Sequence, residues 1–166
     1  MSYSGRGGHY LGRSADIIMS KGEYYLLDES AAVFGEPMIL HGTGISKRGF
    51  NQRPVYSYNV AAGSVKTMGV SVEWRADISG YTAEDWALLG TYNRKRDLSI
   101  LLKGSISIKN VGSGDIEVGD TVIPADGGCE KMTASGQFSL GQAKEKIVSL
   151  HRGLVFVNPD FEKPTI

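Results

Sequence analysis

Acidic residues crowd the region from 115 to 130 and are the first candidates for chemistry in this sequence. Carboxylate oxygens are the ligands that calcium prefers, and the group consists of Asp115, Glu117, Asp120, Asp126 and Glu130. The regular calcium-binding loop that ends in a bidentate glutamate is missing, however, and acidic residues beside glycines are also typical of tight turns. We therefore expect turn-forming and solubilising roles for these carboxylates, and we expect neither a metal nor another cofactor.

Histidine and cysteine residues give no clearer sign of catalysis. His9, His41 and His151 are far apart in the sequence and lack the spacing of a metal site. The single cysteine, Cys129, precedes Glu130, whose negative charge disfavours a reactive thiolate. The sequence has neither a Gly-x-Ser-x-Gly nucleophile motif nor a Gly-Lys-Ser/Thr phosphate-binding loop. These observations predict that the chain is not an enzyme.

Composition and charge narrow the possible partners. The chain has 22 glycines among 166 residues, nearly double the average share, which favours turns and extended segments over helices. Eighteen basic and eighteen acidic residues cancel, so no long-range attraction to nucleic acid or to an anionic membrane is expected. A single cysteine excludes an internal disulfide and agrees with a reducing compartment. No apolar run is long enough to span a membrane, and we expect a soluble protein without an export signal.

The stretch 116–132 is the clearest structural element in the sequence. It predicts a strand, a Gly-Asp turn, a second strand, an Asp-Gly-Gly turn and a third strand. We expect Pro124 to end the middle strand, because proline has no amide proton to donate to a sheet. The residues expected to supply its apolar contacts are Val118, Val122, Cys129 and Met132.

The rest of the chain predicts about nine or ten short strands and one helix. The helix begins at a capping box formed by Thr82 and Asp85, and a late strand is expected over 146–151. The pattern indicates a mainly β fold, an antiparallel β-sandwich or barrel with one short helix and extended terminal arms. We expect a flexible N-terminal arm over residues 1–14, a single β-rich domain over 15–157 and a C-terminal tail over 158–166.

Aromatic and basic residues in the arms and loops are the candidates for partner binding. The N-terminal arm fits either a disordered terminus or a segment that docks on a neighbouring subunit, and its Gly-Arg-Gly-Gly run is a weaker indication of single-stranded nucleic acid. The basic loop 46–54 fits either a solvated surface or a contact with a phosphate backbone or an acidic partner. The cations after the helix fit either helix termination or an intersubunit contact. The residues predicted to bind a partner are Tyr3, Tyr10, Leu11, Arg48, Phe50, Arg94 and Phe161.

Three short motifs in the C-terminal half carry a resemblance to a known group of proteins. They are Val118-Gly119-Asp120-Thr121-Val122, Ala125-Asp126-Gly127-Gly128 and Leu140-Gly141-Gln142-Ala143. Together they resemble the C-terminal part of head decoration, or cement, proteins of tailed bacteriophages. The resemblance covers roughly a fifth of the chain, mostly turn residues.

This resemblance implies a small β protein that sits on an assembled capsid and braces adjacent coat subunits, often as a trimer. The implied partners are the major capsid protein and further copies of the chain itself. The implied location is the capsid surface of the virion, after synthesis in the host cytoplasm. Two alternatives stay open. One is a phage tail-tube or head-completion structural protein, and the other is a small-ligand-binding or enzymatic β-barrel domain, which requires a pocket with converging polar groups.

Overall fold

The structure, a computed structural model, describes residues 17–42, 52–89 and 96–159. Within these ranges it confirms the prediction of a mainly β protein with one short helix. The elements are β1 (Ile18–Met19), β2 (Tyr24–Leu26), β3 (Pro37–Leu40), β4 (Arg53–Ser57), β5 (Gly69–Ser71), α1 (Ala83–Leu89), β6 (Ile100–Lys109), β7 (Thr121–Ala125), β8 (Gly128–Lys131), β9 (Gly141–Ala143) and β10 (Arg152–Val157). The predicted N-terminal arm and residues 160–166 of the predicted tail lie outside the described residues.

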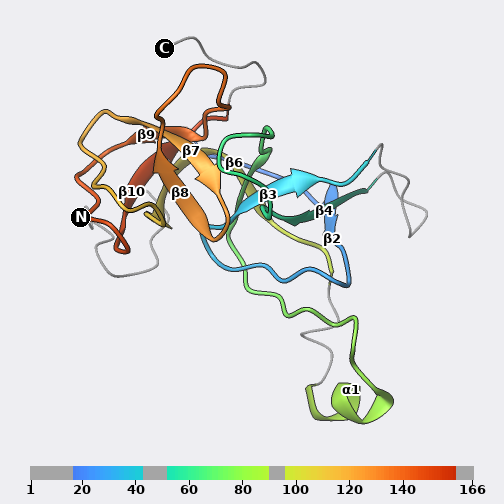
Figure 1. Cartoon of the computed structure of the whole chain (residues 1–166). Helices are drawn as coiled ribbons and strands as arrows, with labels where there is room; N and C mark the ends of the chain where they lie inside the picture. Colours follow the sequence, from blue (N-terminus) through green and yellow to red (C-terminus); the bar gives the residue numbers. More distant parts are fainter. Residues whose placement is uncertain (1–16, 43–51, 90–95, 160–166) are drawn as a thin grey trace, which may run out of the picture.

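The strands belong to one sheet with the order β2-β4-β3-β5-β6-β10-β9-β7-β8, while β1 pairs with β6 (Figure 1). Antiparallel pairing prevails, as predicted, but β2 and β4 run parallel. At the far end, β8 approaches the end of β6 through a single bridge between Asn110 and Cys129. The sheet is therefore strongly curved but is not closed into a barrel.

Strand β6 is the longest element and joins the two halves of the sheet. Its first residues pair with β5, where Leu101 lies opposite Val70, and also with β1, where Leu101 lies opposite Met19. Its remaining residues pair with β10 from Gly104 to Lys109. Because β6 contributes to both halves, its apolar side chains enter both buried clusters.

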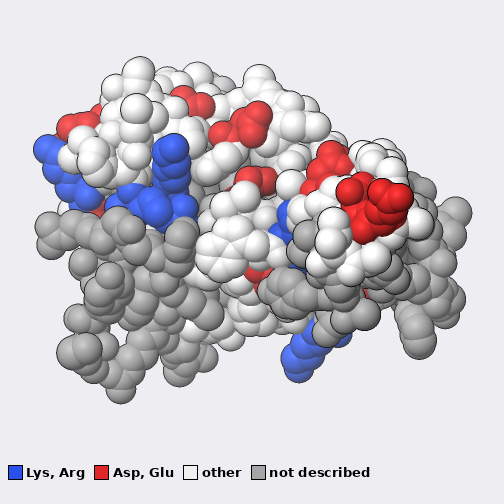
Figure 2. All heavy atoms as spheres, turned by 90° about the horizontal axis from the view of Figure 1, so that it is seen from below, with Lys and Arg blue, Asp and Glu red and all other residues white. Residues whose placement is uncertain are grey.

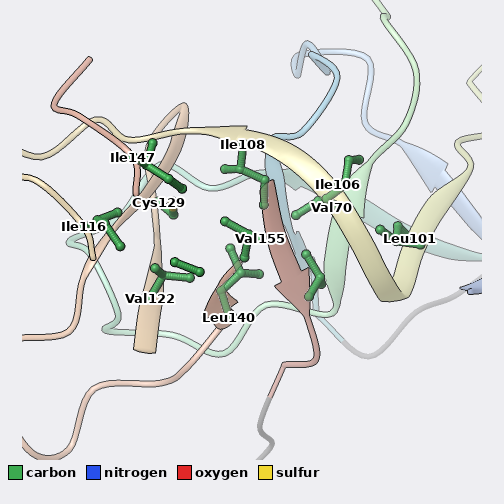
Figure 3. Close-up of a cluster of buried hydrophobic side chains, with 12 residues drawn as sticks. Val70, Leu101, Ile106, Ile108, Ile116, Val122, Cys129, Leu140, Ile147 and Val155 are labelled. Carbon is green, nitrogen blue, oxygen red and sulfur yellow. The ribbon is translucent and has the colours of Figure 1, made fainter. Parts of the chain in front are cut away.

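The larger cluster lies between β6 and the C-terminal strands. Figure 3 shows side chains from the separate strands pointing into one space. Its fully or almost fully buried members are Val70, Leu101, Ile106, Ile108, Ile116, Val122, Cys129, Leu140, Ala143, Ile147, Val155 and Val157. A smaller cluster lies in the N-terminal half and consists of Leu26, Ala32, Met38, Val55, Met68, Leu98 and Ile100. Burial of these apolar side chains is the main favourable contribution to folding.

The predicted hairpin of the 116–132 stretch is present as β7 and β8, joined by Asp126 and Gly127. The expectation that Pro124 ends the strand was wrong, because Pro124 lies inside β7 opposite Cys129. The other neighbour, β9, pairs with β7 only at Thr121 and Val122. On the β9 side of β7, therefore, no strand residue lies opposite Pro124 to accept an amide proton, so proline is tolerated there.

Two further expectations for this half were also wrong. Val118 does not enter the core, and 67% of it is exposed, because it lies in the tight turn that precedes β7. Residues 146–151 form no strand beyond a single bridge at Ile147. There Ser149 donates its backbone amide to the Asp115 carboxylate, and its hydroxyl donates to the Gly112 carbonyl. Because of these side-chain hydrogen bonds, the segment forms a turn and not a strand of the sheet.

The helix α1 begins as the sequence predicts. The Thr82 amide donates to the Asp85 carboxylate over 2.8 Å, and the Asp85 amide donates to the Thr82 hydroxyl over 3.3 Å. This reciprocal capping box satisfies two amides at the helix start. Figure 1 shows α1 standing away from the sheet, and 87% of Leu88 is exposed.

Two arginines hold loops against the sheet. Arg96 is 3% exposed, and its guanidinium donates to the carbonyls of four residues, Leu26, Leu27, Ser30 and Ala76. Arg152 donates to the Phe34 carbonyl and to both the carbonyl and the hydroxyl of Ser107. Arg96 thus supplies donors to carbonyls in and after β2, and Arg152 ties the segment before β3 to β6.

Candidate interaction surfaces

The acidic residues considered as metal ligands are dispersed into turns and ion pairs. Asp115 and Glu117 both pair with Lys146. Asp120 accepts the Glu117 amide and pairs with Lys131. Among the described residues, no group of three or more histidine, cysteine, aspartate or glutamate side chains is arranged to hold a metal ion.

Cys129 is fully buried in the larger cluster. Burial, together with the neighbouring Glu130 carboxylate, raises the pKa of its thiol to about 12. A thiol with this pKa is protonated at neutral pH and is a poor nucleophile. The structure therefore places Cys129 in the core.

Exposed apolar side chains are the more informative surface feature. Val118, Val148 and Leu150 are 67%, 44% and 66% exposed, and we call these three residues the turn surface. They lie in or beside two tight turns that flank the bridge between Ile116 and Ile147. Because both turns are fixed by hydrogen bonds, the apolar side chains are presented to solvent by an ordered backbone.

Leu150 has an unusual backbone. Its φ angle is +66°, and it is the non-glycine residue with positive φ in the described part of the chain. A leucine in this left-handed region costs about 1–2 kcal/mol relative to glycine or asparagine. Its side chain gains little burial in return, since two thirds of the residue is exposed.

A second surface group, the aromatic surface, consists of the exposed Val33 and Trp74 and the partly buried Phe34. The rings of Phe34 and Trp74 stack with their centroids 5.5 Å apart, and Trp74 is 47% exposed. Arg152 holds the Phe34 carbonyl. β5 ends at Ser71, so Trp74 lies beyond the end of the strand.

Charge on the face from which α1 projects is mixed. Figure 2 shows lysine and arginine side chains at one end and again near the middle of this face, with acidic side chains spread across it. A surface with both signs interspersed exerts little long-range attraction on a polyanion.

The predicted partner-binding residues cannot be placed on these surfaces. Tyr3, Tyr10, Leu11, Arg48, Phe50, Arg94 and Phe161 all lie outside the described residues. The turn and aromatic surfaces lay outside the sequence prediction. The apolar type of Val118 and Leu150 is visible in the sequence, but their spacing gives no indication that they are exposed.

Glu36 is the most strongly perturbed carboxyl described. It lies just before β3, and its side chain is half-buried. Desolvation raises its pKa to about 7, and the Asp126 carboxylate contributes in the same direction, while a hydrogen bond with the Ser57 side chain opposes the rise. Protonation of Glu36 therefore relieves its repulsion with Asp126, which lies in the turn between β7 and β8.

We expect this carboxyl to make stability depend on pH. The folded state binds a proton at Glu36 more tightly than the unfolded state, so the contribution is complete below about pH 4.5 and is lost as the pH rises through about 7. Allowing for solvent screening of a partly exposed group, Glu36→Gln should stabilise the protein by about 1–2 kcal/mol at pH 8 relative to wild type. Urea unfolding at pH 5 and pH 8 measures this difference. Equal wild-type and variant pH profiles would contradict it.

Within the described residues, no helix is long and apolar enough to cross a membrane. The sequence matches no protein-family model, and no curated protein matches it significantly.

Proposed function

We propose that this chain is a virion structural protein, a head decoration protein that binds and stabilises an assembled capsid through protein–protein contacts. The observation that carries the proposal is that apolar side chains are exposed on turns fixed by hydrogen bonds, above all Leu150 at positive φ. Backbone strain at an exposed apolar residue does not stabilise the fold. We therefore expect this residue to contribute to binding another molecule.

Two other features support a role in assembly. The two halves of the sheet are held together, because β6 pairs with strands of both halves. In addition, Arg152 of β10 donates a hydrogen bond to the Phe34 carbonyl in the segment before β3. Symmetric assembly multiplies weak contacts, so small surfaces such as the turn surface are sufficient when many copies bind. The resemblance of the turn motifs to phage decoration proteins points in the same direction.

Electron microscopy of negatively stained samples tests the proposal. The purified chain is mixed with empty phage heads and, separately, with unassembled coat protein. A decoration protein is expected to attach to assembled heads and to leave unassembled coat protein alone. Stacked rings formed by the chain itself would favour the tail-tube or head-completion alternative, and monomers that ignore both preparations would contradict the proposal.

Leu150→Asn separates folding from binding at the turn surface. Asparagine tolerates positive φ, so we expect the free energy of unfolding to rise by about 0.5–1 kcal/mol. Attachment to heads should weaken at the same time, because an apolar contact is lost. Urea unfolding and co-sedimentation measure the two effects.

The matched control is Leu88→Asn, the same change at an exposed leucine in the ordinary backbone of α1. It should lower stability slightly, because asparagine is a poorer helix former than leucine. A Leu150→Asn variant that is less stable than wild type, or that attaches as tightly, would remove the turn surface from the proposed interface.

A further inference from the structure

A pocket of about 410 Å³ opens between the loop after β2 and the neighbouring strand β4. The residues around it are mostly polar or aromatic. They come from the loop after β2, from the residue that follows β3, and from the end of β4 and the residues just after it. They are Leu27, Glu29, Ser30, Ala31, His41, Tyr56, Ser57 and Asn59. None of these lining residues is a lysine or an arginine.

The inner part of the pocket is fixed by hydrogen bonds. Ser30 is 8% exposed, and its hydroxyl accepts the Ser57 amide over 3.0 Å and lies 3.4 Å from the Ser57 hydroxyl. The buried Arg96 guanidinium holds the carbonyls of Leu27 and Ser30 at 2.7 and 2.8 Å. The two hydroxyls are therefore held in place before any ligand arrives, which lowers the entropic cost of binding.

The outer part of the pocket combines rings with negative charge. His41 and Tyr56 meet edge to face with their centroids 5.7 Å apart. The exposed Glu29 has no ion-pair partner among the described residues. Glu29 is the carboxylate among the lining residues, and its negative charge favours a cation in the outer part of the pocket.

We propose that this pocket binds the guanidinium group of an arginine side chain presented by a protein partner. A guanidinium is planar and always charged; it forms paired hydrogen bonds with a carboxylate and stacks on aromatic rings. Glu29 supplies the carboxylate, the Tyr56 ring supplies the aromatic surface, and the hydroxyls of Ser30 and Ser57 accept further N–H donors. This site is separate from the turn surface and stands even if the partner is not a capsid.

Chemical-shift titration of the full chain by NMR tests the assignment. The probe is N-acetyl-arginine amide, compared with N-acetyl-citrulline amide, which has nearly the same shape but no charge. A single side chain should bind saturably with a dissociation constant on the order of millimolar. We expect shifts centred on the amides of Ser30, Ser57 and Asn59. Citrulline should bind at least about tenfold more weakly, because it lacks the charge that strengthens these hydrogen bonds.

Variants distinguish the pocket from general attraction between charges. Glu29→Gln should weaken arginine binding about fivefold or more, since it removes the charged acceptor. Glu84→Gln makes the same charge change on the projecting helix α1 and should leave binding unchanged. Equal loss in both variants, equal binding of arginine and citrulline, or shifts scattered over the surface would overturn the proposal. N-acetyl-lysine amide binding as tightly as the arginine probe would overturn its guanidinium specificity.

Discussion

Replacing Arg96 with methionine is expected to lower the free energy of unfolding by about 3–5 kcal/mol. The side chain is almost fully buried, and its guanidinium donates to the carbonyls of Leu26, Leu27, Ser30 and Ala76. Methionine matches its length and apolar stem but removes the guanidinium donors to these carbonyls, of which the Leu27 carbonyl keeps the Ser30 amide. Each unsatisfied buried acceptor costs about 1–3 kcal/mol, although water entering the loop will recover part of the loss.

The effect should be specific to the buried guanidinium. Arg53→Met removes the same charge from the exposed surface of β4 and should change stability by no more than about 0.5 kcal/mol. Arg96→Lys should lie between these variants, because a lysine keeps the charge but cannot reach all of the carbonyls with one planar fork. Urea unfolding followed by circular dichroism measures all three. An Arg96→Met protein as stable as Arg53→Met would show that the loop does not depend on this residue.

Gly141→Ala is expected to cost about 3 kcal/mol or more through steric conflict. Gly141 pairs with Val157 of β10 and Val122 of β7, so it lies where β9 joins the β7–β8 hairpin to β10. A Cβ atom at this position would lie 1.9 Å from the Phe156 carbonyl oxygen. That oxygen belongs to the backbone, so β9 and β10 have to move apart to admit the methyl group.

The control for this substitution is Gly114→Ala. A Cβ atom at Gly114 would meet no atom within 4 Å, and the variant should remain within about 0.5 kcal/mol of wild type. Hydrogen exchange adds a local measurement, because separation of β9 from β10 should reduce protection in β7 and β8 more than in β3. Unchanged stability and protection in Gly141→Ala would contradict the close packing of these strands.

Local features of this fold were predictable from the sequence. The turn at Asp126 and Gly127 and the capping box of Thr82 and Asp85 both depend on residues a few positions apart, and both are present. The mainly β character followed from the short apolar runs and the glycine content. Local chemistry determines such elements because their partners are already adjacent in the chain.

Long-range features were not predictable in the same way. Arg96 bonds to carbonyls about 70 residues earlier in the chain, and its sequence context reads as an ordinary cationic helix end. The parallel pairing of β2 with β4 and the exposure of Trp74 also depend on where strands end in three dimensions. An alternating pattern gives the face of each residue only while the strand continues.

The candidate surfaces show the same division. The apolar character of Val118 and Leu150 is visible in the sequence, but their exposure follows from turns that side-chain hydrogen bonds create. The pocket combines Glu29 and Tyr56 from segments brought together by the parallel pair of β2 and β4. Neither site forms a contiguous motif, so spacing along the chain gave no indication of it.

A quantitative mass-spectrometric inventory of purified, salt-washed virus particles is the most direct test of the proposed function. We predict that the chain is found in the particles at a fixed ratio to the major coat protein, as expected for a protein that occupies equivalent positions on a symmetric shell. If the chain is absent from the particles and present only in the soluble fraction of the lysate, it is not a virion structural protein.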